Sequence, residues 1–198
     1  MPRSSKATHS RILDAAYVLF RKKGFTRVNV DEIAAAARIT KRTLYSHFRS
    51  KDAMLAEVLE SQHQLALDAF HTFGNKLTGS TRTIVRGVFQ ELTTWASSPR
   101  WSGSGFTRLV VELADLPGHP ARSIAKKHKE LLESHLSELL GRSGAKNPRI
   151  LAREIWLLFE GAMVLVLIHG DRSYLKAAEE AVLKLLPKAV GGKQPHQS

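Results

Sequence analysis

The sequence predicts an all-α protein of about nine helices. Apolar residues recur every three to four positions along most of the chain, no segment alternates as a β-strand would, and neither a hairpin dipeptide nor an internal repeat is present. With 198 residues and 43% apolar content, the chain is long enough for one medium domain or two small ones.

Each expected helix has its own start or stop signal, because capping residues begin helices and glycine or proline ends them. The expected helices cover residues 11–23, 30–36, 40–48, 50–74, 81–97, 105–114, 120–141, 148–169 and 173–186. The N-cap signals are Asn29 with Glu32 as a capping box, Thr40, Ser50, Asn147 before Pro148, and Ser173. The stop signals are Gly24, Gly74, Pro99, Pro117, Gly141 and Pro187.

Basic residues are in excess, and the excess is concentrated near the N-terminus. Thirty Lys and Arg against 18 Asp and Glu give a net charge of +12. Residues 1–55 hold twelve basic and four acidic residues, a net +8, whereas residues 56–198 hold eighteen and fourteen, a net +4. Such an excess indicates a polyanionic partner, either nucleic acid or an anionic membrane surface. The asymmetry favours a basic binding module followed by a nearly balanced domain.

Two short helices, 30–36 and 40–48, are joined by about three residues, and the preceding helix 11–23 offers them an apolar face. This is the pattern of a helix-turn-helix unit, whose second helix can lie in a DNA major groove. Leu44 and Phe48 are four residues apart and should face the core. Four residues remain on the outward faces: Lys41, Arg42, Tyr45 and Ser46.

The N-terminal part resembles the TetR family of bacterial transcriptional regulators, in its AcrR-like form. The resemblance is carried by RILDAAYVLFRKKGF (11–25), NVDEIAAAARITKRTLYSHF (29–48) and SKDAML (50–55). It covers residues 6–66, which we expect to form the DNA-binding domain. Residues 67–190 should then form a ligand-binding and dimerisation domain, and 191–198 a disordered tail.

The resemblance implies roles for seven residues. The positions that match Lys41, Arg42 and Ser46 face base edges in the family, and those that match Tyr45, His47 and Lys51, with Thr43 nearby, contact phosphates. Arg42 stands where a small residue is common; it can read guanine or contact a phosphate. Arg38 stands where the family has Gly, a position that suits positive φ.

The resemblance further implies a two-fold dimer, a double-stranded DNA operator and a small-molecule effector. Twelve of the fourteen residues 155–168 are apolar, so this helix needs burial on two sides, from its own chain or from a partner subunit. Gly161, Ala177, Ala178 and Ala181 would permit close helix approach. The expected effector is apolar or aromatic. The candidate cavity residues are Phe70, Phe89, Trp95, Trp101, Phe106, Arg108, Glu112, Trp156, Phe159, Glu160 and Met163.

Other functional classes have weaker support. The chain has no cysteine, and its histidines show no compact metal-binding spacing, so we expect no metal or cofactor and no enzymatic activity. The longest apolar run, 155–168, is fourteen residues long and contains Glu160, whereas a membrane span needs about 20. We therefore expect no membrane segment and a cytoplasmic location. The expected function is ligand-controlled repression of transcription. The alternatives are activation of transcription by a protein of the same family and a helical small-molecule enzyme.

Overall fold

The computed structural model describes residues 2–99 and 101–187, and within these ranges all regular structure is α-helical. The helices are α1 (Pro2–Lys23), α2 (Val30–Ala36), α3 (Lys41–His47), α4 (Lys51–Gly74), α5 (Thr81–Ala96), α6 (Gly105–Glu112), α7 (Pro120–Arg142), α8 (Pro148–His169) and α9 (Ser173–Leu185). The predicted fold class is confirmed. No helix in the described ranges has the length and apolarity that a membrane crossing needs.

Three predicted N-caps are confirmed by their hydrogen bonds. The Asn29 side chain accepts from the backbone N–H of Glu32, and the Glu32 carboxylate accepts from the N–H of Asn29 in return. Thr40 and Ser50 accept from the backbone three residues ahead, at the starts of α3 and α4. These local bonds satisfy N–H groups that the first helical turn leaves unpaired.

The predicted pair at the start of α8 is confirmed in position: Asn147 is the N-cap and Pro148 is the first helical residue, although the Asn147 side chain makes no capping bond. The predicted cap of α9 is wrong, because Ser173 is the first residue of the helix and Arg172 is its N-cap. The carboxylate of Asp171 accepts from the Ser173 N–H at 2.8 Å and from its hydroxyl at 2.7 Å, and these bonds lower the pKa of Asp171.

The first helix begins at Pro2, about nine residues earlier than the apolar pattern predicts. His9 anchors this extension: its ring stacks on Phe48 with 4.5 Å between ring centroids, and its Nε2 lies 2.7 Å from the Glu57 carboxylate. These contacts to α3 and α4 stabilise a segment that has no apolar stripe of its own.

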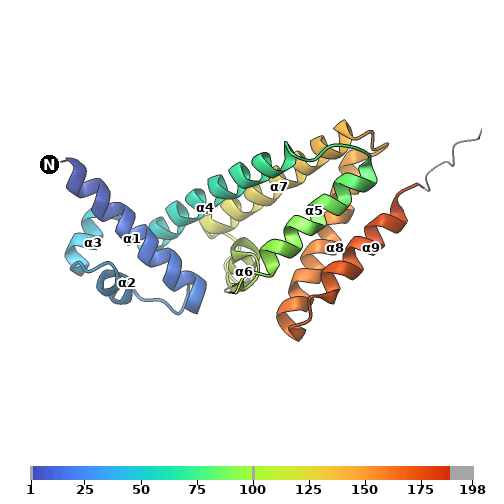
Figure 1. Ribbon diagram of the computed structural model, residues 1–198. Helices are drawn as coiled ribbons and strands as arrows, with labels where there is room; N and C mark the ends of the chain where they lie inside the picture. The colour runs from blue at the N-terminus through green and yellow to red at the C-terminus, as the bar shows by residue number, and fades with distance from the viewer. Residues whose placement is uncertain (1, 100, 188–198) are drawn as a thin grey trace, which may run out of the picture.

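The helices form two parts joined by α4, α6 and α7 (Figure 1). Helices α1–α3 gather around the start of α4 at one end, and α8 and α9 pack side by side at the other. Helices α4 and α7 run in the same direction, since His63 meets His128 and His71 meets His135 further along. Helix α5 packs on α9 and α7.

Two apolar clusters stabilise this arrangement. The first, which we call the joint core, packs α1–α3 and the start of α4 against α6 and the first two turns of α7. The second packs α5 and the end of α7 against α8 and α9. The joint core includes Ile12, Phe20, Ile33, Leu44, Phe48, Met54, Phe106, Leu109, Leu113, Ala121 and Ala125. The helix-turn-helix unit thus shares its core with α6 and α7.

Candidate nucleic-acid interface and internal cavity

The turn between α2 and α3 is a Schellman motif built on a non-glycine residue. The N–H of Ile39 bonds to the Ala34 carbonyl at 3.0 Å, and the N–H of Arg38 bonds to the Ala35 carbonyl at 3.1 Å. This motif requires a left-handed residue after the C-cap Ala37, and Arg38 has φ +54°. A non-glycine residue in that region costs about 1 kcal/mol. The positive φ predicted for Arg38 is confirmed.

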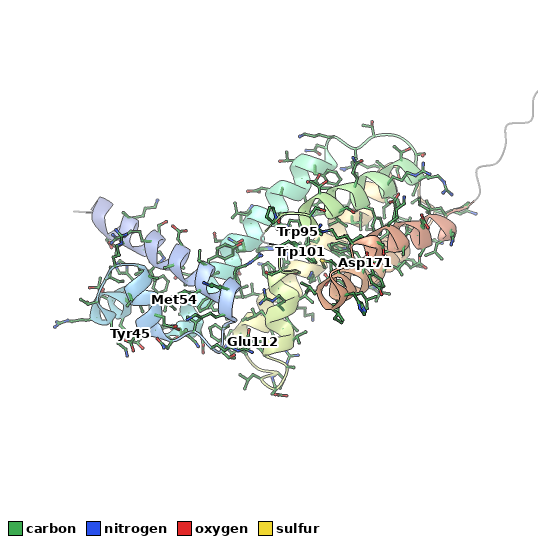
Figure 2. The ribbon with its side chains drawn as sticks, turned by 60° about the horizontal axis from the view of Figure 1, so that its bottom comes forward. Tyr45, Met54, Trp95, Trp101, Glu112 and Asp171 are labelled. Carbon is green, nitrogen blue, oxygen red and sulfur yellow. The ribbon has the colours of Figure 1, made fainter. Side chains whose placement is uncertain are left out.

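The recognition-type helix α3 presents the faces that its spacing predicts. Leu44 is fully buried, whereas Lys41, Arg42, Tyr45 and Ser46 are exposed. Figure 2 shows Tyr45 pointing outward from the end of the molecule that α1–α3 form. Four of the seven predicted DNA-contact residues therefore lie together on one open surface.

The polar groups of α3 differ in whether they already make local hydrogen bonds. The Ser46 hydroxyl donates to the Thr43 carbonyl at 2.7 Å, so its lone pairs remain for a partner's donor. The Thr43 hydroxyl lies 2.9 Å from that of Thr40, and the half-buried His47 ring lies 5.8 Å from His9. Within the described residues, the side chains of Arg42 and Tyr45 make no such bond.

Lys41 makes an exposed ion pair with Asp31 of α2, at 3.1 Å. An exposed pair of this kind contributes at most about 1 kcal/mol, so phosphate or a base edge can compete for the ammonium group.

Lys51 points inward rather than toward the α3 surface. Its ammonium group donates to the carbonyls of Phe25 and Val28, each at 3.0 Å, and lies 4.3 Å from the centre of the Phe25 ring. The predicted phosphate contact would have to replace at least one of these bonds. In the structure Lys51 fixes the loop between α1 and α2.

Glu112, at the end of α6, holds the same loop from the other side. Its carboxylate accepts from the N–H of Phe25 at 3.0 Å, and from the N–H and hydroxyl of Thr26 at 2.8 and 2.5 Å. Burial opposes ionisation, but these bonds and nearby Arg108 outweigh it and lower the pKa of Glu112. A Cβ at Gly24 would come within 2.9 Å of this carboxylate, and the φ of +88° at this residue also favours glycine.

Arg108 and His119 add further contacts across this junction. Arg108 donates to the Ser102 hydroxyl at 2.9 Å and to the Arg21 carbonyl at 3.3 Å. His119 caps α7 through the N–H of Ala121, and its Nε2 lies 3.6 Å from an Asp52 carboxylate oxygen, beyond hydrogen-bonding distance. Helix α6 therefore holds the end of α1 and the beginning of the α1–α2 loop, and His119 lies beside Phe25 and the start of α4. In Figure 2, Glu112 lies between the α1–α3 end and the rest of the molecule.

A cavity of about 980 Å³ lies between the two apolar clusters. Its wall combines the middle of α4 with parts of α5, α6, α7 and α8 and with the end of α1. Nine of the eleven predicted cavity residues line it: Phe70, Trp95, Phe106, Arg108, Glu112, Trp156, Phe159, Glu160 and Met163.

Two predicted cavity residues do not line the cavity. Phe89 is fully buried in the second apolar cluster and does not reach the cavity. Trp101 packs edge-on against the lining residue Trp95, with 5.8 Å between ring centroids (Figure 2).

The Glu160 carboxylate is paired with other side chains of its own chain. Its carboxylate pairs with the Lys129 ammonium group and accepts from the Thr107 hydroxyl at 2.9 Å. Lys129 also lies 5.4 Å from the centre of the Trp156 ring. Helices α6, α7 and α8 thus meet at one polar group in an otherwise largely apolar wall.

The structure also brings together two histidines that sequence reasoning left unassigned. His63 and His128 are buried, and their Nδ1 atoms lie 2.9 Å apart, which requires one to donate and the other to accept. Burial, with the charges of Lys129 and His63, lowers the pKa of His128 to about 3. Phe106 stacks on His128 at 3.8 Å between ring centroids. The sequence signal that could have identified His128 was its helical register, because this residue lies on the apolar stripe of α7.

The histidine pair has no third candidate metal ligand beside it among the described residues. In the two described ranges, no three His, Asp or Glu side chains stand close enough together to hold a metal ion. A pair of hydrogen-bonded imidazoles lacks the ligand number of a structural or catalytic zinc site.

Helix α8 carries an apolar stripe that its own chain leaves uncovered. Leu157 is 69% exposed and Ile168 is 66% exposed, and between them Gly161 has nothing near its missing Cβ. On α9, Ala177 is exposed, but Ala178 is buried within the subunit and takes no part in this surface.

Comparison with known proteins shows which proteins this chain resembles. Residues 12–58 match the family of bacterial regulatory proteins, tetR family. The chain is 34% identical to the transposon Tn10 TetC protein of Escherichia coli over 37% of this chain and 36% of that protein. It is 37% identical to the HTH-type transcriptional repressor SCO4008 of Streptomyces coelicolor, over 30% and 31%. The chain thus spans about a third of the length of each of these curated relatives.

Solved structures extend the likeness to nearly the whole chain. SCO4454, a TetR-family transcriptional regulator from Streptomyces coelicolor, superposes with a TM-score of 0.78 at 26% identity, covering 89% of this chain and 94% of that one. Reduced NemR of Escherichia coli shares the fold, with a TM-score of 0.79 at 23% identity, covering 92% and 99%. The match of the helix-turn-helix segment and the shared fold over about nine-tenths of the chain support a TetR-family transcriptional regulator.

Proposed function

We propose that the chain is a ligand-responsive repressor that binds a pseudo-palindromic operator as a homodimer and leaves it when an apolar or aromatic molecule fills the cavity. One observation carries the proposal: α4 and α6 line the cavity and also hold the helix-turn-helix unit. The same protein would act in the cytoplasm.

The DNA-binding half of the proposal is supported by the exposed face of α3. Lys41, Arg42 and Tyr45 are open to solvent on a helix whose other side is locked into the joint core. A rigid helix with long donors on its outer face can enter a major groove without reorganising its own core.

Dimerisation is supported by the stripe on α8, where Leu157, Gly161 and Ile168 are uncovered. A two-fold axis would pair this stripe with its copy, and the exposed glycine permits close approach. Gly161→Leu should therefore lower the mass in light scattering from that of a dimer toward the 22.0 kDa of one chain. A dimer of unchanged stability in this variant would place the interface elsewhere.

Coupling between cavity and DNA is supported by the path of two helices. Helix α4 starts at Lys51, which holds the α1–α2 loop, and its Leu55–Phe73 side lines the cavity. Helix α6 lines the cavity with Phe106 and ends at Glu112, on the same loop. A ligand that shifts either helix changes the separation of the two recognition helices, which must be about 34–36 Å to read two half-sites together.

The expected coupling free energy between effector binding and DNA binding is about 1–3 kcal/mol. The coupling is reciprocal, so the effector and the DNA lower each other's affinity by the same factor. Activation uses the same geometry, since the position of the operator decides between the two.

The test has two steps. A duplex is first selected from a random pool by the unaltered protein, and small apolar and aromatic compounds are screened by thermal shift. Each stabilising compound is then titrated against the protein–duplex complex by fluorescence anisotropy. We expect the tightest compounds to weaken DNA binding by about 5–150-fold. Compounds that stabilise the protein but leave DNA affinity unchanged would refute the coupling, and failure to enrich any duplex would refute DNA binding.

A further inference from the structure

Arg38 occupies a backbone position that favours glycine. The two hydrogen bonds of the Schellman motif, from Arg38 and Ile39, exist only when the residue after the C-cap is left-handed. Five glycines in the described ranges have positive φ, and Arg38 is the one non-glycine residue there that does. Strained residues that persist in this way are often found at functional sites.

The side chain of Arg38 has no visible role in the fold. It is exposed, and within the described residues its guanidinium group makes no hydrogen bond and no ion pair. The charge at the end of α2 is favourable to the helix dipole, but that effect is screened at an exposed site and Lys would provide it equally well. Neither packing nor pairing accounts for arginine at this position.

The position of Arg38 relative to α3 suggests what it contacts. It lies three residues before Lys41, directly ahead of the end of α3 that enters the groove first in a helix-turn-helix complex. A residue ahead of the base-reading positions should lie nearer to the phosphates that flank the groove. A guanidinium group binds a phosphate through two parallel hydrogen bonds.

We propose that Arg38 is an additional DNA-contact residue that clamps a backbone phosphate beside the groove occupied by α3. The proposal rests on the proposed DNA-binding function and extends its contact surface from α3 into the turn. Arg38 then contributes affinity on every sequence without reading any base.

The experiment uses the full chain and three variants, Arg38→Gly, Arg38→Lys and Arg142→Gly. The last removes one exposed positive charge from the far end of α7 and serves as the matched control. Fluorescence anisotropy measures affinity for the selected duplex and for a mixed-sequence duplex between about 50 and 200 mM salt. Differential scanning fluorimetry confirms folding.

For Arg38→Gly we expect an unreduced Tm, because glycine suits the turn. Affinity should fall by about tenfold or more on both duplexes. In a dimer, which loses two phosphate contacts, the slope of log affinity against log salt should become shallower by about 1.8. Arg38→Lys should keep most of the slope, and Arg142→Gly should change neither slope nor affinity beyond the uniform effect of net charge.

Each of the other outcomes would overturn a different part of the proposal. An Arg38→Gly variant that binds like Arg142→Gly, while Arg42→Ala lowers affinity, overturns the Arg38 proposal alone. A loss confined to the selected duplex overturns the phosphate assignment, because it makes Arg38 a base-reading residue. If Lys41→Ala and Arg42→Ala also leave both affinities unchanged, the proposed DNA-binding function itself fails.

Discussion

Replacing Glu112 by glutamine should loosen the loop between α1 and α2 without changing the size of the side chain. The carboxylate accepts three hydrogen bonds, one from the N–H of Phe25 and two from Thr26. Glutamine keeps one oxygen for Thr26 but turns an NH₂ group toward the Phe25 N–H, so two donors face each other.

The loss of free energy of unfolding follows from this change. A hydrogen bond to a charged group contributes about 1.5–3 kcal/mol, and the partly open loop favours the lower end of that range. We therefore expect Glu112→Gln to lower the free energy of unfolding by about 2 kcal/mol. In a chain of this size the Tm should fall by about 4–8 °C.

The effect should depend on pH in a defined direction. The pKa of Glu112 in the folded protein lies below its ordinary value of 4.5. Its contribution is therefore complete above that value and is lost as the pH falls through the lower, folded-state pKa. Because glutamine does not titrate, the Tm difference between the two proteins should be full at pH 7 and smaller below about pH 4.

Differential scanning calorimetry at both pH values measures the difference, with Glu138→Gln as a control on the exposed face of α7. Equal melting temperatures for the two variants at pH 7 would show that the loop does not depend on the Glu112 carboxylate. A gap that stays constant with pH would show that its charge contributes nothing.

Three further predictions concern the other polar contacts. Lys51→Met should lower the free energy of unfolding in urea by about 1–3 kcal/mol, because the two loop carbonyls lose their donor; an unchanged midpoint would contradict this. Lys129→Met and Glu160→Gln should each lower the free energy of unfolding by about 1–3 kcal/mol. In a double-mutant cycle, the double variant should lose less than the sum of the two single losses. Strictly additive losses would argue against coupling between the two residues. His128 has a folded pKa of about 3, below its ordinary 6.5. The free energy of unfolding should therefore fall as the pH falls from about 6.5 toward 3. In urea titrations, His128→Gln should make this loss smaller. An equal loss in both proteins would assign the acid sensitivity to other groups.

Features that depend on neighbours in sequence were predictable from the residues alone. The caps at Asn29, Thr40 and Ser50 bond to atoms three residues away, so their signals are complete within one helical turn. The outward face of α3 follows from the burial of Leu44 and the helical period. Asp171 was missed as the partner of α9 because it lies one residue before the N-cap, Arg172, and bonds to the first helical residue, Ser173.

Contacts between distant segments were not predictable. Glu112 and Thr26 are 86 residues apart, and His63 and His128 are 65 apart, so only the fold shows that they meet. Phe89 and Trp95 lie on the same helix, and one-dimensional periodicity does not tell which side of α5 faces the cavity and which faces the second apolar cluster.

The joint core limits how this protein can be divided. A cut after residue 66 would remove Phe106, Leu109 and Leu113 from the apolar surface of α1–α4 and would leave the Phe25 and Thr26 N–H groups without their acceptor. We expect a fragment 1–66 to be poorly folded. Chimaeras that exchange sensory domains among relatives should therefore keep α6 and the beginning of α7 with the helix-turn-helix donor. The transferable unit of recognition is thus discontinuous in sequence, and recombination between relatives at a single point would rarely preserve it.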